Sequence, residues 1–304
     1  MKRAPVMRLV DPKPLSPVVF VTGKGGVGKT TVAAGLAVAA VEAGTEAVYV
    51  EFADGQSGQR ALGSAGKAVK RVVIDPKKAV VDAARPLFGS SILARVALDN
   101  FAMKPFIGAA PAVRELAVLA LVQRCVEEHP GARVVVDMPA TGHSVAWLRV
   151  PAQGRDLIRY GPLYDLCERL ARELVAPDKS SVVVVTLPER MVLQETLELC
   201  ETLTRDVGMT PSRLIVNRVP MRLPEDALPD ARRIAQDAND GATREAAGAL
   251  AHRLALRHAI TSELERTLLE TLGEAATAAT IIPHALMDPS SDTLAAWLRE
   301  RGAG

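Results

Sequence analysis

The residues best suited to chemistry form a glycine-rich segment near the N-terminus. It reads Gly23-Lys24-Gly25-Gly26-Val27-Gly28-Lys29-Thr30 and is followed by Thr31. The segment fits the pattern G-x-x-x-x-G-K-[ST], in which glycines let successive backbone N–H groups turn towards phosphate oxygens. Lys29 can reach the β- and γ-phosphates, and the Thr30 hydroxyl can ligate Mg²⁺. The pattern therefore predicts a nucleoside triphosphate site over residues 23–31.

An acidic residue ends a second apolar run, Arg133–Asp137. A carboxylate at the end of a buried strand is the usual second ligand of a nucleotide-bound Mg²⁺, often through water. We therefore predict that Asp137 and Thr30 hold the metal ion. Because Gly142 follows Thr141, the loop after Asp137 is able to move when the γ-phosphate leaves.

Asn217 ends another apolar run, Arg213–Asn217. Its side-chain amide can donate and accept hydrogen bonds together, so it can read the edge of an adenine base. An asparagine that simply forms a turn is the alternative.

Short apolar runs must position these residues. They are rich in β-branched side chains and nearly continuous, which is typical of a parallel sheet covered on both faces. The expected strands are Val18–Thr22, Ala47–Phe52, Arg71–Ile74, Arg133–Asp137, Ser181–Thr186, Arg213–Asn217 and Thr280–Ile282. Helical patterns alternate with them, among them Thr30–Ala43, where Gly35 would allow close packing on the sheet, and Arg190–Val207, which Gly208 would cap. The alternation predicts a doubly wound, mainly parallel α/β fold of the P-loop NTPase type.

Residues 18–304 are expected to form a single domain behind a flexible lead-in, residues 1–17. A helical subdomain is expected as an insertion at about 77–130, which is rich in large apolar residues. Its last helix, Glu115–Glu127, is apolar on every side, so it is either core or one wall of a hydrophobic groove for a client helix. The Ala- and Arg-rich segment 223–256 is expected to add surface helices without an assigned role.

Composition limits the classes of function. The chain of 304 residues carries 37 basic and 35 acidic residues, a net charge of +2, which gives no general attraction to nucleic acid. Three separated cysteines, Cys125, Cys167 and Cys200, form no C-x-x-C pair. We interpret Cys167 and Cys200 as core residues on helices. Without a signal peptide or an apolar run long enough to span a bilayer, we expect a cytoplasmic protein that is not an integral membrane protein.

Two segments resemble a known family. Lys24, a second lysine directly after the first glycine, gives the loop the deviant form of the MinD, ParA, nitrogenase-iron-protein and ArsA ATPases. Residues Asp137–Ser144 read D-M-P-A-T-G-H-S and resemble the D-T-A-P-T-G-H-T switch segment of ArsA-type ATPases, which include the tail-anchored-protein targeting ATPases. The resemblance extends from about Val18 to Pro283 and implies ATP with Mg²⁺ as ligands.

The resemblance also implies roles for single residues. Lys24 would reach across a dimer interface to the partner's nucleotide and stabilise charge on the transferring phosphate; a solvated surface lysine is the alternative. Asn217 matches the family's adenine-contacting asparagine, and His143 would belong to the γ-phosphate switch.

A catalytic role for Asp54 is also implied by resemblance. The family carries an aspartate in D-P-A-H that positions the attacking water, and Asp54 occupies the matching loop, with Glu51 as the alternative. The proline and histidine of that motif are absent here, and an acidic residue in a turn is an ordinary structural choice. This departure bears on the rate of hydrolysis more than on nucleotide binding.

The resemblance implies a slow, partner-stimulated ATPase that acts as a dimeric molecular switch. With one ATPase unit in the chain, the dimer would be a homodimer or a heterodimer with a paralogous ATPase. Its nucleotide state would control binding of a protein client, such as a hydrophobic or tail-anchored segment. The absence of C-x-x-C argues against a zinc-clamped dimer, and core cysteines argue against an arsenite site.

Two other functions compete. One is a ParA/MinD-like positioning ATPase on DNA or a membrane, which the near-neutral charge and lack of a terminal basic amphipathic helix disfavour. We therefore expect no specific nucleic acid partner. The other is a non-hydrolysing ATP-binding subunit of a paralogous heterodimer.

Overall fold

The sequence folds around a seven-stranded sheet in which every neighbouring pair of strands is parallel. The computed structural model describes residues 14–52, 56–88, 111–139, 141–273, 275–285 and 289–300. The strand order is β3-β2-β4-β1-β5-β6-β7. The strands are β1 (Val18–Gly23), β2 (Ala47–Phe52), β3 (Lys70–Ile74), β4 (Arg133–Asp137), β5 (Ser180–Thr186), β6 (Arg213–Val219) and β7 (Thr280–Pro283). The expected doubly wound α/β class is confirmed, and each expected strand is found within two residues of its bounds.

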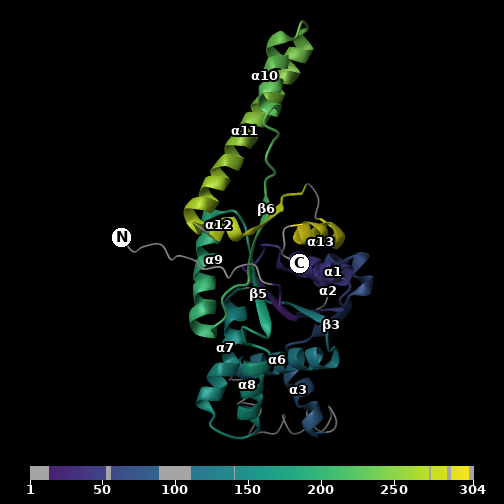
Figure 1. Cartoon of the computed structure of the whole chain (residues 1–304), viewed down its shortest axis with the longest axis vertical. Coiled ribbons are helices and arrows are strands. Elements are labelled where there is room, and N and C mark those ends of the chain that lie inside the picture. The colour runs from purple at the N-terminus through teal and green to yellow at the C-terminus, as the bar shows by residue number, and fades with distance from the viewer. Residues whose placement is uncertain are drawn as a thin grey trace, which may run out of the picture.

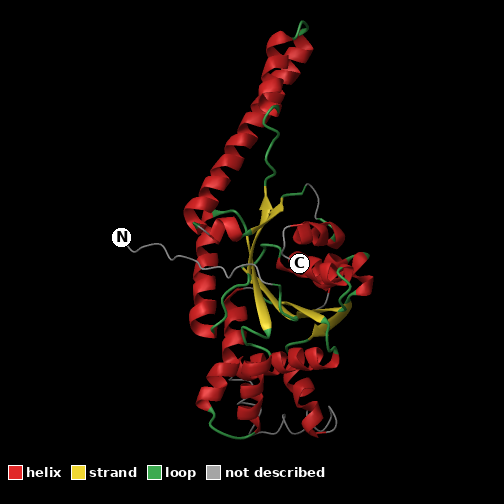
Figure 2. Cartoon of the chain, viewed as in Figure 1, coloured by secondary structure: helices red, strands yellow, loops and turns green. Residues whose placement is uncertain are grey.

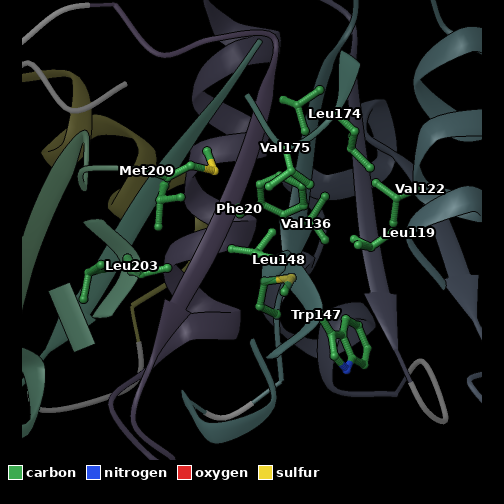
Figure 3. Close-up of a cluster of buried hydrophobic side chains, with 14 of the residues drawn as sticks. Phe20, Leu119, Val122, Val136, Trp147, Leu148, Leu174, Val175, Leu203 and Met209 are labelled. Carbon is green, nitrogen blue, oxygen red and sulfur yellow. The ribbon is translucent and has the colours of Figure 1, made fainter. Parts of the chain in front are cut away.

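The sheet is buried on both faces, which explains its continuous apolar strands. Every residue of β1 and of β5 is buried. Because side chains alternate along a strand, Phe20 packs in one core cluster, whereas Val19 and Val21 pack in the other. Figure 3 shows the first cluster, where Phe20 and Val136 of the sheet lie among side chains such as Leu119 and Leu148 of the covering helices.

Helices connect successive strands and cover the two faces (Figure 1). They are α1 (Lys29–Glu42), α2 (Gln56–Leu62), α3 (Ala79–Phe88), α6 (Pro111–Glu128), α7 (Thr141–Leu157), α8 (Pro162–Glu173), α9 (Arg190–Thr202), α10 (Ala227–Asp237), α11 (Gly241–Leu272), α12 (Ala275–Ala278) and α13 (Ser291–Glu300). The helices of one face, α1, α2 and α13, contribute to the second cluster; α6, α7, α8 and α9 contribute to the first. Among the helices of the described ranges, none combines the length and apolar character that a membrane span requires.

The packing of Gly35 differs from the sequence prediction. A Cβ at this position would lie 2.8 Å from Leu294 Cδ2, on helix α13. The small residue therefore permits close approach of α13 to α1, not of α1 to the sheet. The prediction failed because α1 is buried on nearly its whole circumference, from Val32 to Ala40, so its apolar pattern alone does not say which neighbour needs the space.

The expected insertion contributes α3 and α6 to the described structure; residues 89–110 lie outside it. Leu116, Val118 and Leu119 of α6 are buried in the first cluster. The apolar α6 is thus core on one side. The space between α3, α6 and α8 holds a cavity of about 700 Å³, and another of about 460 Å³ lies between α7 and α9.

Arg124 on α6 fixes helix α3. Pro86 has no N–H group, so within α3 the carbonyl of Asp82, four residues earlier, lacks its usual helical donor. The Arg124 guanidinium donates to this carbonyl at 3.3 Å and to that of Ala83 at 3.4 Å. The side chain therefore replaces the missing backbone bond and joins the two helices.

Helices α10 and α11 form an antiparallel hairpin that projects away from the sheet (Figures 1 and 2). The Asp240 carboxylate caps α11 by accepting from Thr243 N at 2.7 Å. Helix α10 and the first part of α11 lie in segment 223–256, and α11 continues to Leu272. At the base of the hairpin, Arg190 of α9 pairs with Glu270 of α11 at 2.9 Å.

The end of the expected flexible lead-in is packed against the sheet. Leu15 is buried, Ser16 N donates to Ser181 Oγ at 2.9 Å, and Pro17 O accepts from Val134 N at 2.8 Å. These three residues therefore continue β1 towards the N-terminus and are held against the sheet. Residues 1–13 lie outside the described structure.

Candidate nucleotide site

The glycine-rich loop joins β1 to the first turn of α1, as its pattern predicted. Gly23, Gly26 and Gly28 have φ angles of 147°, 82° and 96°, which L-residues with a side chain rarely adopt. A Cβ at Gly23 would also lie 2.2 Å from Val185 O on the neighbouring strand β5. Helix α1 begins at Lys29, so its free N–H groups and positive dipole face the loop, an arrangement that suits an anion.

Lys29, Thr30 and Asp137 meet at this end of the sheet. Strand β4 pairs with β1, and Asp137 is opposite Val21 in the register, so the carboxyl ends of both strands lie together. Thr30 Oγ1 donates to Asp137 Oδ2 at 2.7 Å. Lys29 Nζ donates to the carbonyl of Lys24, across the loop, at 3.0 Å.

Tyr49 of β2 is a further member of this group. Its hydroxyl donates to Asp137 Oδ2 at 3.0 Å, and the tyrosine is fully buried. Asp137 Oδ1 is also buried, and no described residue hydrogen-bonds to it. One carboxylate oxygen thus accepts from two hydroxyls while the other has no partner among the described residues.

Burial shapes the protonation of the group. Desolvation raises the pKa of Asp137, against the lowering effect of the Thr30 and Tyr49 hydrogen bonds and the Lys29 charge. Desolvation lowers the pKa of Lys29, which the nearby Asp137 carboxylate partly offsets. Desolvation, then Asp137, raise the pKa of Tyr49, so its hydroxyl remains a donor. A cation or a phosphate placed here would offset the cost of burying these charges.

Asn217 lies on the other side of the loop. Its Nδ2 donates to Val27 O at 2.8 Å, and its Oδ1 accepts from Arg218 N at 2.9 Å. A Cβ on Gly28 would lie 2.4 Å from Asn217 Nδ2. The asparagine is therefore held against the loop, and its amide keeps one N–H and part of its acceptor capacity for a ligand.

A cavity of about 250 Å³ opens beside Asn217. Its lining joins the start of α1 to the ends of β6 and β7; Thr31, Arg218, Pro283 and His284 are among its residues. His284 N donates to Val219 O at 2.8 Å, which fixes the segment after β7. The cavity also adjoins Gly28, the last glycine of the loop.

Lys24 does not point into the site of its own chain. Its ammonium pairs with the Glu195 carboxylate on α9, at 2.8 Å to Oε1 and 2.7 Å to Oε2. Both side chains are partly exposed.

Of the two acidic candidates for positioning water, Glu51 lies within β2 and Asp54 follows this strand in the sequence. Asp54 lies outside the described residues. Glu51 is buried; its Oε2 accepts from Gly58 N at 2.9 Å and its Oε1 lies 3.6 Å from Arg71 Nη1. Glu51 therefore anchors α2 to β2, a structural task that does not require a role in catalysis.

Sequence reasoning did not find a buried hydroxyl pair behind the loop. The Thr22 hydroxyl, one residue before the end of β1, lies 2.7 Å from the Ser144 hydroxyl in the first turn of α7. Both residues are fully buried. The pair joins the nucleotide loop to the helix that follows Asp137. Ser144 belongs to the segment that suggested a switch, but its partner could be found only from the fold. Helix α7 begins at Thr141, and of Thr141–His143 only the backbone is described.

The three cysteines are buried free thiols that form no disulfide. Burial raises the pKa of Cys125 to about 11 and that of Cys200 to about 12. Within the described part of the chain, no group of three or more His, Cys, Asp or Glu residues has a metal-binding arrangement. The interpretation of Cys167 and Cys200 as core residues is confirmed.

The parallel sheet, the G-x-x-x-x-G-K-T loop between β1 and α1, and the acidic end of the adjacent strand define a P-loop nucleotide-binding protein. The chain belongs to the CobQ/CobB/MinD/ParA nucleotide binding domain family, whose pattern matches residues 18–241.

Two curated relatives are named as ATPases. The chain is 28% identical over 230 residues to ATPase BagA of Mycobacterium tuberculosis (strain ATCC 25618 / H37Rv), covering 68% of this chain and 67% of that protein. It is 27% identical over 239 residues to a putative arsenical pump-driving ATPase of Halobacterium salinarum, covering 68% of this chain but only 36% of that protein. Only the second relative is named for an arsenical pump, and it supports a relation to ArsA-type proteins at low identity.

Proposed function

We propose that this protein is an ATP-binding and ATP-hydrolysing dimeric switch of the ArsA type. The observation that carries the proposal is the meeting of Lys29, Thr30 and Asp137 beside a loop whose glycines hold phosphate-binding geometry. Relatives named as ATPases support the same activity. A cytoplasmic location belongs to the proposal.

The donor set fits Mg²⁺. This ion prefers hard oxygen ligands and keeps several waters. Thr30 supplies a hydroxyl, and Asp137 supplies a buried carboxylate whose Oδ1 has no partner among the described residues. Thr30 and Asp137 would hold the ion, which when bound neutralises charge on the phosphates.

The chain's own residues supply the rest of the site. Backbone N–H groups of Gly25–Thr31 bind the phosphates, and the Lys29 ammonium, which donates to Lys24 O, turns to the β- and γ-phosphates. Asn217 and the cavity beside it hold the adenine. Asp54 orients the water that attacks the γ-phosphate. Glu51 is a weaker choice, because Gly58 and Arg71 already occupy its carboxylate.

Lys24 is assigned to the partner's site. Its ammonium is on the protein surface, 42% exposed, where it can cross an interface. A second cation at the transferring phosphate stabilises the transition state electrostatically. The partner is a second copy of this chain or a paralogous ATPase.

The client, in this proposal, is a protein with a hydrophobic segment, such as a tail-anchored one. Support comes from the mainly apolar walls of the cavity between α3, α6 and α8, where Val80, Val113 and Leu163 are among the lining residues. A ParA/MinD-like positioning role on DNA or membranes, and a non-hydrolysing role in a heterodimer, are the other outcomes that experiments can reveal.

The test is phosphate release from ATP by the purified chain, with and without Mg²⁺. We expect slow release that requires the metal and is lost in Lys29→Ala, while Lys179→Ala, which removes an exposed lysine far along the sequence, leaves it unchanged. ATP binding without release would contradict the enzymatic proposal and favour the non-hydrolysing subunit.

A further inference from the structure

The bidentate ion pair between Lys24 and Glu195 has a consequence for dimer formation. We propose that Glu195 holds Lys24 within its own subunit, so that the partner's nucleotide must displace Glu195 before the dimer closes. This inference rests on the proposed function, since it requires that Lys24 acts in the partner's site. Glu195 would be a positioning residue that sets the protein concentration at which hydrolysis begins.

Helix α9 holds Glu195 in place. The next residue, Thr196, is buried; its hydroxyl donates to Thr186 Oγ1 at 2.8 Å and lies 2.7 Å from Val192 O. Thr186 ends β5, the strand next to β1. Because these contacts tie α9 to the sheet, Glu195 cannot follow Lys24 towards a partner, and the pair must separate.

Among the described residues, no cation other than Lys24 forms an ion pair with Glu195. The pair stands at a cavity of about 460 Å³ between α7 and α9, which Arg149 also lines. Arg149 is engaged elsewhere, since its Nη1 lies 3.3 Å from Asp206 Oδ2. Glu195 therefore depends on Lys24 for its counter-ion.

The expected effect is modest because both partners are partly exposed. Exposed ion pairs shift an equilibrium by about two- to fivefold. Because each of the two subunits breaks one pair when the homodimer closes, loss of the pair should change the dimerisation midpoint by the square of this factor, about four- to twenty-fivefold. The rate at saturating protein should stay unchanged, because Glu195 has no role in the closed site. Added salt should reduce the difference between variants, since it screens the pair.

The experiment measures phosphate release from Mg-ATP against protein concentration for the full chain. Glu195→Gln removes the charge without changing the size of the side chain, and Glu195→Asp keeps the carboxylate. Glu198→Gln is the matched control, because Glu198 is exposed on the same helix and lines the same cavity. We expect the half-maximal concentration to fall about four- to twenty-fivefold in Glu195→Gln, in which the homodimer has lost two pairs. It should stay near the wild-type value in Glu195→Asp and Glu198→Gln.

Two results distinguish a failure of the Glu195 inference from a failure of the proposed function. If release rises with concentration and is lost in Lys24→Ala, yet Glu195→Gln has the wild-type midpoint, the role of Glu195 is overturned and the proposed function stands. If the wild type shows no release that depends on Lys24 and on concentration, the proposed function itself is overturned.

Discussion

Removing the Tyr49 hydroxyl tests the electrostatics of the site most sharply. Tyr49→Phe keeps the buried ring and deletes only the donor that lies 3.0 Å from Asp137 Oδ2. The ring still fills its place in the core, so the change leaves almost no cavity. What the substitution measures is therefore the worth of one hydrogen bond to a buried carboxylate.

The magnitude follows from that geometry. Hydrogen bonds to charged groups contribute about 1.5–3 kcal/mol to the free energy of unfolding. Asp137 would keep the Thr30 hydroxyl at 2.7 Å as its partner, so the carboxylate would not be left without a donor. We expect the free energy of unfolding at pH 7 to fall by about 1.5–2.5 kcal/mol, in the lower part of that range.

The loss should depend on pH in a defined direction. Burial raises the folded-state pKa of Asp137 above its unfolded value. Ionisation of Asp137 therefore costs stability: the cost is absent below the unfolded pKa and is complete above the folded one. Tyr49→Phe enlarges this cost, so its effect should be largest at neutral pH and shrink as acidification protonates Asp137.

The assay is urea unfolding at several pH values, with Tyr160→Phe as the control because Tyr160 is 87% exposed. The control should stay within about 0.5 kcal/mol of the wild type, as surface substitutions do. A Tyr49→Phe loss as small as that of the control, or one that grows towards acidic pH, would refute the reasoning.

Three further substitutions or treatments have expected outcomes. Gly28→Ala places a Cβ 2.4 Å from Asn217 Nδ2 at a φ of 96°. Equilibrium binding should therefore show an ATP affinity at least about tenfold weaker, a loss of about 1.4 kcal/mol or more. The control Gly44→Ala, whose φ is 83° but whose Cβ meets open space, should bind ATP normally, and equal losses in the two variants would contradict the account. Gly35→Ala should lower the free energy of unfolding by about 1–3 kcal/mol through overpacking against Leu294. In urea unfolding, the double variant Gly35→Ala/Leu294→Ala should lose less free energy of unfolding than the two single variants together. Strict additivity would argue against the contact. Cys125 and Cys200 have pKa values of about 11 and about 12. These buried thiols should therefore resist iodoacetamide at about pH 8 until urea unfolds the protein. Rapid labelling of the native chain, detected by mass spectrometry, would contradict their burial.

The sequence predicted the sheet well for a physical reason. A strand covered on both faces must be apolar at consecutive positions, so runs such as Ser181–Thr186 are visible without knowledge of their neighbours. The candidate site residues Asp137 and Asn217 were predicted for the same reason: Asp137 ends β4, and the continuously buried part of β6 stops before Asn217. The loop before Lys29 has a local pattern and needs no tertiary information.

The remaining features depend on contacts between distant parts of the chain. Tyr49 looks like any apolar strand residue until β2 lies beside β4 and its hydroxyl meets Asp137. Lys24 and Glu195 are 171 residues apart in sequence, so no local pattern indicates that they form an ion pair. The helix α11 extends to Leu272 because its base packs on α9, and composition alone did not locate that boundary.

The central claim is that Lys24 completes the partner's site, and a mixing experiment tests it most directly. Lys24→Ala chains keep a complete loop but give no lysine to a partner; Lys29→Ala chains give Lys24 but lack the phosphate-binding lysine. Each variant alone should be inactive. We expect an equal mixture to recover about a quarter of the wild-type phosphate release, because half of randomly formed dimers are mixed and each has one complete site. A mixture that forms mixed dimers by sedimentation, yet is as inactive as either variant alone, would contradict the claim.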